Sequence, residues 1–142
     1  MSHETKTKEV LNGGEFLINE SDASSVFIPE ELNEEQKMIV DTAREFIEKE
    51  IWPKLDAIDH QEEGVAVGLI NKAGELGLLG TSVPEEYGGF GQDFNSNTAL
   101  AMTLGTSHSI GVSFAAHTGI GTLPIMYYGT EEQKKKYLPK LA

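Results

Sequence analysis

The chain has 142 residues, a formal net charge of −12, 39% hydrophobic residues and 24% charged residues. This length suffices for one domain with a hydrophobic core. The acidic balance argues against nucleic acid as a partner, because phosphate recognition needs a cationic face. Without cysteine the chain has no disulfide or cysteine-based zinc site, and its four histidines show no metal-ligand spacing. No apolar run suits a signal peptide or a transmembrane helix, so we expect a cytoplasmic protein.

Residues 1–31 are expected to form a tail or an arm docked on the rest of the chain. They contain Gly13-Gly14, mix polar residues and show no sustained periodicity. Two apolar patches, Phe16-Leu17-Ile18 and Val26-Phe27-Ile28, favour docking over free disorder. Pro29 separates this segment from the helices that follow.

A first helix is predicted to begin after Asn33 and to end near Ile51 or Trp52. Asn33 and Gln36 have the spacing of a capping box, in which each side chain bonds to the main chain of the other residue. Apolar residues then recur at intervals of three and four, which predicts one buried stripe. Pro53 should end the helix, because the residue before a proline avoids helical geometry.

Two further helices are predicted over residues 53–60 and 65–76. Gly77 can adopt the left-handed conformation that commonly ends a helix, so we expect it to terminate the second of them. Residues 81–97 are rich in proline and glycine and should form a loop.

A fourth helix is predicted to start at a cap formed by Asn95 or Asn97 and to reach about Gly105. The fifth, over residues 109–128, is apolar on nearly all sides, which predicts burial on several sides.

The last helix follows a second capping box, formed by Thr130 and Gln133, and should end at Pro139. Five or six helices and no convincing strand predict an all-α bundle.

The common catalytic motifs are missing from the sequence. Gly111-Val-Ser113-Phe-Ala115 lacks the last glycine of a nucleophile elbow, and Gly119-Ile-Gly121 lacks the strand and third glycine of a dinucleotide fingerprint. His117 lies in the apolar fifth helix, where a polar group must find a partner or line a cavity. Of these two interpretations, a partnered core histidine is favoured.

Three segments, taken together and in this order, resemble the acyl-CoA dehydrogenase family. They are Leu32-Asn-Glu-Glu-Gln36, then Leu76-Gly-Leu-Leu-Gly80 with Val83-Pro-Glu-Glu-Tyr87-Gly-Gly89, and finally Gly129-Thr-Glu-Glu-Gln133-Lys-Lys-Lys-Tyr137-Leu-Pro139. Within the family, Ala116-His117 with Gly119-Ile-Gly121 is similar to the long-chain and very-long-chain members. The segment Gly13-Gly-Glu-Phe-Leu-Ile18 is similar to bacterial proteins of that branch.

The resemblance implies that residues 32–142 form the N-terminal helical domain of this family, an orthogonal bundle. The family's middle β-domain and C-terminal helical domain would be absent from the chain. Members introduce an α,β double bond into fatty acyl-CoA, use FAD as cofactor, pass electrons to electron-transferring flavoprotein and form homo-oligomers. The catalytic base and main flavin contacts lie in the other two domains. We therefore expect neither catalytic nor cofactor-binding residues here, and no FAD binding or activity by the 142 residues alone.

In such a family the N-terminal domain supplies one wall of the acyl pocket. By position, the substrate-binding residues would be Ser113, Phe114 and His117, together with Met102 and Gly121. The small residues Ala116, Gly119 and Gly121 would leave room for a long acyl chain. Ordinary helix packing is the alternative for each of these positions.

Two other functions are compatible with the sequence. An acyl-CoA oxidase or a flavin monooxygenase of the same superfamily would share this domain and differ in its electron acceptor. A stand-alone helical interaction module would instead be expected to have a closed, polar outer surface.

Overall fold

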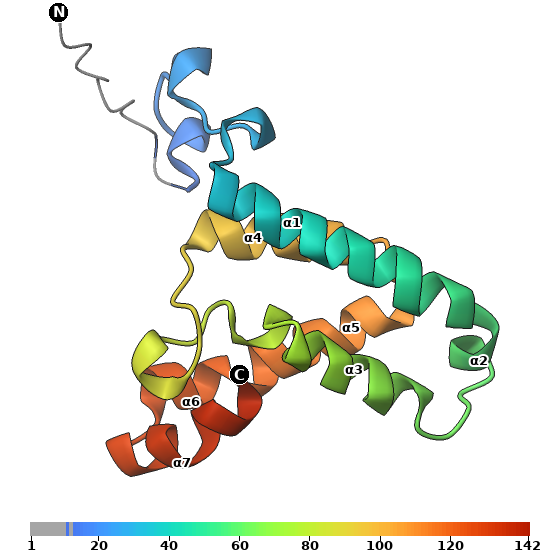
Figure 1. The fold of residues 1–142 in the computed structure, drawn as a ribbon. Coiled ribbons are helices and arrows are strands. Elements are labelled where there is room, and N and C mark those ends of the chain that lie inside the picture. Colours follow the sequence, from blue (N-terminus) through green and yellow to red (C-terminus); the bar gives the residue numbers. More distant parts are fainter. Residues whose placement is uncertain (1–10, 12) are drawn as a thin grey trace, which may run out of the picture. The chain divides into compact units, whose positions relative to one another are not determined.

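A computed structural model describes residue 11 and residues 13–142, and it divides the chain into two units that meet after Asn33. The first unit contains three short 3-10 turns, Glu15–Leu17, Ala23–Ser25 and Pro29–Glu31. The second unit, Glu34–Ala142, contains the α-helices α1 to α7 (Figure 1). Docking of the first segment stays a prediction, and what was expected of residues 1–10 and 12 lies outside the described residues.

Helices α1 and α2 come from one nearly continuous helical run. α1 (Glu34–Phe46) begins directly after Asn33 and continues as a π-helical turn over Ile47–Ile51. A 3-10 turn at Trp52–Lys54 then leads into α2 (Leu55–Asp59). The π-helical turn ends at Ile51, near the predicted position, but Trp52 before Pro53 keeps helical angles (φ −56°, ψ −39°), so the proline changes the type of helix and does not end the run.

Helix α3 (Val65–Glu75) ends as the sequence predicts. Gly77 has a φ of 77°, and its amide donates to the carbonyl oxygen of Gly74 at 2.8 Å. A Cβ atom at Gly77 would lie 2.7 Å from the ring of Phe90. Both the left-handed backbone and the neighbouring ring therefore favour glycine here.

Helix α4 (Phe94–Leu104) begins earlier than predicted, and the expected caps Asn95 and Asn97 are wrong. Asp93 is the N-cap, and its Oδ1 accepts hydrogen bonds from the amide of Ser96 at 2.7 Å and its hydroxyl at 2.6 Å. A carboxylate suits this position because it satisfies a free amide at the positive end of the helix dipole. The bonds from Ser96 also lower the pKa of the Asp93 carboxyl.

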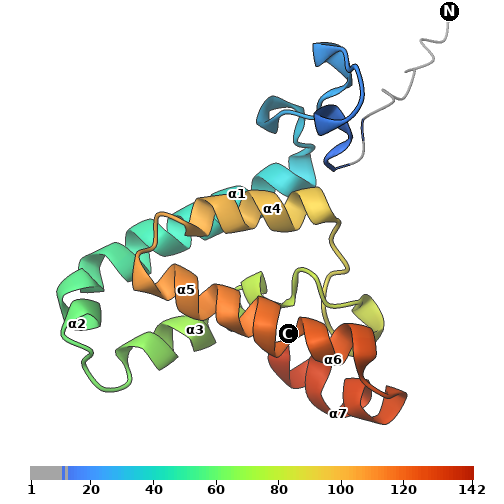
Figure 2. The same cartoon turned by 180° about the vertical axis from the view of Figure 1, so that it is seen from behind.

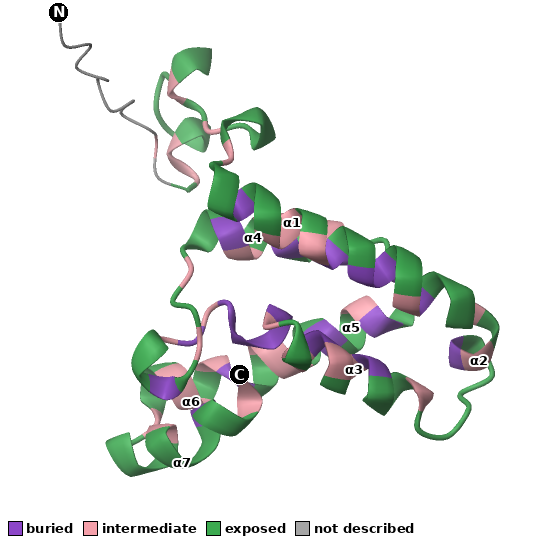
Figure 3. Ribbon diagram, viewed as in Figure 1, coloured by how far each residue is buried: buried purple, intermediate pink, exposed green. Residues whose placement is uncertain are grey.

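Two clusters of buried side chains hold the second unit together, and Figure 3 shows where the buried residues lie on the helices. α1 and α4 run side by side in both views (Figures 1 and 2). Their contact is reinforced by the buried Gln36, whose Nε2 lies 3.3 Å from both carboxylate oxygens of Asp93. The larger cluster includes Phe46, Ile51, Leu69, Leu100, Leu104, Ile110 and Phe114. The smaller cluster consists of Val83, Tyr87 and Leu138.

The predicted fifth helix is divided and is less buried than expected. α5 (Ser109–Ala115) passes through a π-helical stretch, Ala116–Gly121, into α6 (Leu123–Tyr128). The prediction of burial on several sides is wrong, because Val112 and Ile120 are 72% and 82% exposed. Within the described residues, packing covers the side that carries Ile110 and Phe114 and leaves the opposite apolar side open.

Helix α7 (Glu131–Leu141) starts with the predicted capping box. The amide of Thr130 donates to Gln133 Oε1 at 2.8 Å, and the amide of Gln133 donates to Thr130 Oγ1 at 3.3 Å. The predicted end at Pro139 is wrong, because the helix continues to Leu141. A proline this close to the end removes one amide donor, while the amide of Ala142 still reaches the carbonyl of Leu138 at 2.9 Å.

The all-α fold is confirmed for the described residues, which contain helices and turns but no strand. None of their helices is both long enough and apolar enough to cross a membrane. The cytoplasmic location stays a prediction.

Candidate functional site

The candidate site is a groove of about 720 Å³ between α4 on one side and α5 and α6 on the other. Figure 2 shows α4 and α5, the two walls of this groove, diverging from the turn that joins them. Its walls are mainly apolar. They are formed by Leu100, Ala101, Leu104, Gly111, Val112, Phe114, Ala115, Gly119, Leu123, Met126 and Tyr127, with Phe94 near its mouth.

The polar residues at the loop end of the groove bond mainly to one another. Thr81 Oγ1 donates to Asn97 Oδ1 at 2.7 Å, and Asn97 Nδ2 donates to the carbonyl oxygen of Gln92 at 3.1 Å. The side-chain Nε2 of Gln92 in turn donates to Glu35 Oε1 at 2.7 Å. This network ties the loop before α4 to α1 and leaves the apolar walls as the main surface offered to a ligand.

A second contact fixes the loop against α7. The hydroxyl of Tyr87 donates to Glu131 Oε2 at 2.8 Å, and Tyr87 itself is buried. This bond to a carboxylate raises the pKa of Tyr87 to about 12 and holds the pKa of Glu131 below its ordinary value. The loop, α6 and α7 are therefore held together on one side of the groove.

Phe114 and His117 are the two predicted site residues that take part in packing. Phe114 is 6% exposed, belongs to the larger core cluster and also lines the groove. His117 is half-buried, and its Nε2 lies 2.8 Å from the carbonyl oxygen of Leu141. Because a carbonyl oxygen can only accept, Nε2 carries the proton, and the ring satisfies a carbonyl in the last turn of α7. His117 thus has the partner that the favoured interpretation required.

Of the five predicted site residues, only Phe114 lines the groove, and His117, Ser113, Gly121 and Met102 do not. Ser113 and Gly121 are exposed on the open side of the α5–α6 run, the side that carries Val112 and Ile120. Met102 is 67% exposed on α4. The structure therefore places Phe114 in the groove and the pair Ser113 and Gly121 on the adjoining open side.

The sequence indicated Gly119 as a small residue of the site, but Gly111 and Ala115 were missed, although a signal for them was present. The three residues recur every four positions, a spacing that places small residues on one side of a helix. No comparable signal marks His108, which lines the groove because of the way the turn after α4 is folded.

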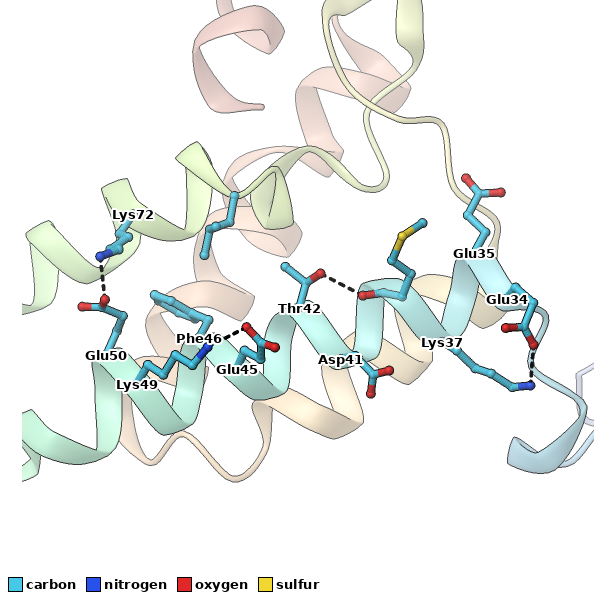
Figure 4. A pocket seen from close by; sticks show the side chains of 12 residues that line it. Glu34, Glu35, Lys37, Asp41, Thr42, Glu45, Phe46, Lys49, Glu50 and Lys72 are labelled. Atoms are coloured by element: carbon cyan, nitrogen blue, oxygen red, sulfur yellow. Dashed lines mark hydrogen bonds and ion pairs between the residues drawn. The ribbon is translucent and has the colours of Figure 1, made fainter.

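A larger hollow, of about 960 Å³, lies between α1 and α3, and its lining is strongly charged (Figure 4). Lys49 pairs with Glu45 at 2.9 Å, and Glu50 accepts from Lys72 at 2.6 Å. The ammonium groups of Lys72 and Lys54 lower the pKa of the Glu50 carboxyl. The cations are thus engaged with neighbouring carboxylates, and the described residues hold no group of three or more side chains suited to a metal ion. We therefore place the candidate site at the smaller, apolar groove.

Comparison with known proteins gives consistent matches. Residues 33–142 match the family described as "Acyl-CoA dehydrogenase, N-terminal domain". A probable acyl-CoA dehydrogenase of Bacillus subtilis is 45% identical over 137 residues, which cover 96% of this chain and 23% of that protein. The mitochondrial isovaleryl-CoA dehydrogenase of Bos taurus is 37% identical over 112 residues, or 78% of this chain and 26% of that protein. The crystal structure of an acyl-CoA dehydrogenase complexed with FAD from Bacillus anthracis superimposes with a TM-score of 0.86 at 46% identity. That match covers 94% of this chain and 23% of the other.

The chain thus spans about a quarter of the length of these relatives. The matched region contains α1 to α7 and therefore the whole of the groove. On this evidence the chain belongs to the acyl-CoA dehydrogenase family, and residues 33–142 form the N-terminal domain of that family.

Proposed function

We propose that this chain is the N-terminal part of a FAD-dependent acyl-CoA dehydrogenase that introduces an α,β double bond into fatty acyl-CoA. Its part in the reaction is to supply one wall of the acyl pocket. The observation that carries the proposal is the uncovered apolar side of the α5–α6 run, where Val112 and Ile120 are 72% and 82% exposed, in a domain of this family.

The open side argues against the alternative of a stand-alone helical module. Such a module would be expected to have a polar outer surface, whereas exposed apolar patches usually mark a binding surface. Tyr127 and Tyr128 extend this side and are 65% and 88% exposed. An apolar side of this kind suits contact with an acyl chain or with other parts of a larger enzyme.

The proposed wall comprises Ser113, Phe114 and His117, with Met102 and Gly121 at its edges. The acyl chain would lie in the groove, which adjoins the open side at Val112, and Ser113 and Gly121 would border it there, where their small size leaves space. Phe114 and His117 would instead hold the helix in position. Phe114 does so by packing in the larger core cluster, and His117 by its bond to the carbonyl oxygen of Leu141.

FAD would be held outside this chain. The groove offers no lysine or arginine side chain to a pyrophosphate, and the side chains of Thr81 and Asn97 bond to each other while that of Gln92 bonds to Glu35. We therefore assign no cofactor-binding and no catalytic residue to these 142 residues. The flavin, when bound by the rest of the enzyme, would supply the redox chemistry.

Small residues support a preference for long acyl chains, and with it the long-chain and very-long-chain branch of the family. Gly119 has no positive φ, and a Cβ atom built on it would meet nothing within 4 Å. Glycine in a helix costs up to ~1 kcal/mol relative to alanine, and neither packing nor backbone geometry requires it here. The space above Gly119 is therefore available to a ligand. A Gly119→Leu variant of the full enzyme should lose activity on long acyl-CoA before short acyl-CoA.

The central experiment uses the complete gene product that carries this chain. The purified protein should contain FAD, acyl-CoA should bleach the flavin absorbance without oxygen, and electron-transferring flavoprotein should restore it as enoyl-CoA accumulates. Rapid reoxidation by oxygen in place of electron-transferring flavoprotein would instead favour the acyl-CoA oxidase or monooxygenase alternatives. Absence of enoyl-CoA would contradict the proposal, as would turnover by residues 1–142 alone. Sedimentation of the complete protein would test the proposed homo-oligomer.

A further inference from the structure

His108 has an unusual backbone conformation at the closed end of the groove. It lies in the turn that joins α4 to α5, with φ 55° and ψ −135°. Among the described residues, His108 and Gln61 are the two non-glycine residues with positive φ. Side chains with a Cβ are disfavoured in this region of φ and ψ, and such outliers persist where something else favours the residue.

The rest of the chain offers no reason for histidine at this position. The side chain makes no capping bond to α5, and no hydrogen bond or ion pair of the imidazole is found among the described residues. The carbonyl oxygen of His108 accepts from the amide of Gly111 at 3.1 Å, a main-chain bond that any residue could make. Folding alone would therefore be served better by glycine.

The position of His108 suggests what the ring does. It lines the groove together with Leu104 and Gly105 from the end of α4 and Val112 from α5. This turn joins the two walls of the groove, α4 and α5, which come together there in Figure 2, so a ligand that lies along the groove has one end here. His108 is exposed, so its ring is available to a ligand at this end of the groove.

We infer that His108 is a specificity-determining residue that closes the far end of the groove and limits the length of the acyl chain. The inference rests on the proposed function, because the occupant of the groove is taken to be the acyl chain of the substrate. The imidazole presents a polar ring where the apolar walls end. A chain that extends past it would lose apolar contact and would have to displace the ring.

The test is a chain-length profile of the complete FAD-loaded enzyme, measured as kcat/KM over straight-chain acyl-CoA thioesters of increasing length. His108→Ala should move the optimum to longer chains, with a gain of about fourfold for each additional buried methylene. His108→Phe should move the optimum to shorter chains. If the two variants shift the optimal acyl length in opposite directions, His108 contacts the end of the acyl chain. A general effect on folding would not produce opposite shifts.

Gln61→Gly is the matched control, because Gln61 also has positive φ but lies in the turn between α2 and α3, away from the groove. His108→Gly and Gln61→Gly should both raise thermal stability by relieving the backbone, but the first alone should change the length profile. An active enzyme with the same profile in all His108 variants would overturn this inference and leave the proposed function intact. An enzyme that oxidises no acyl-CoA would overturn the proposed function and this inference with it.

Discussion

Gly111→Ala and Gly119→Ala add the same methyl group at two positions of the run from α5 to α6, and they should change stability in opposite directions. Neither glycine has a positive φ, so alanine is compatible with the backbone at both positions. Each substitution should gain up to about 1 kcal/mol, because alanine loses less backbone entropy on folding than glycine.

The difference between the two variants comes from their surroundings. A Cβ atom at Gly111 would lie 2.8 Å from the carbonyl oxygen of Leu104 and 3.0 Å from the hydroxyl of Ser107. The main chain of α4 would have to move, and overpacking of this kind costs about 1–3 kcal/mol. At Gly119 no atom lies within 4 Å, so this cost is absent. Gly111→Ala should therefore be less stable than Gly119→Ala by about 1–3 kcal/mol.

Urea unfolding followed by far-UV circular dichroism measures this difference in the free energy of unfolding. Equal denaturant slopes in the two variants would show that the same surface is exposed on unfolding, so that the midpoints can be compared. Equal stabilities would refute the steric argument. Destabilisation by Gly119→Ala would show that glycine at this position serves folding. It would also remove one argument for the proposed preference for long acyl chains.

Three further predictions concern α7 and its contacts. Leu138→Ala should lower the free energy of unfolding by about 2–5 kcal/mol, because Leu138 is 0% exposed and Leu-to-Ala changes in a core leave a cavity. Thermal unfolding of the variant and of the parent protein would measure this loss. An unchanged melting temperature would contradict the prediction and would show that the smaller cluster is loosely packed. Thr130→Ala should cost about 1 kcal/mol by removing the capping bond to the amide of Gln133, and Thr130→Ser, measured by the same denaturation, should retain it. The bond to Glu131 raises the pKa of Tyr87 to about 12, so its stabilisation should be complete below about pH 10 and lost as the pH rises toward 12. Tyr87→Phe should flatten that part of the pH–stability curve, and an unchanged slope would show that the bond contributes nothing.

The sequence predicted the helices well where a local signal marks their ends. The capping box of Thr130 and Gln133 and the stop at Gly77 both depend on residues close together in the chain. The cap of α4 was missed because Asp93, Asn95 and Asn97 are all suitable cap residues and lie within a short segment. Asp93 succeeds because its carboxylate also binds Gln36, which is distant in the sequence.

The candidate site was predicted less completely. Phe114 and the small residues of α5 could be found from spacing and from the resemblance to the family. The bond from His117 to Leu141 depends on how α7 packs, and no pattern in the sequence indicates it. The apolar character of residues 109–128 was correctly identified, but its interpretation as burial was wrong, because hydrophobicity does not show which surface covers a residue.

By itself, then, the sequence determined the all-α class, most helix ends and the family, since these follow from local bonding preferences and from three motifs in order. Tertiary structure decided which residues share the groove. The packing of α5 against α4 brings Leu104 and Phe114 to one hollow and leaves Ser113 on the open side. The positive φ of His108 was likewise visible only in the structure. Such positions depend on the summed contacts of the whole unit, which no short stretch of sequence contains.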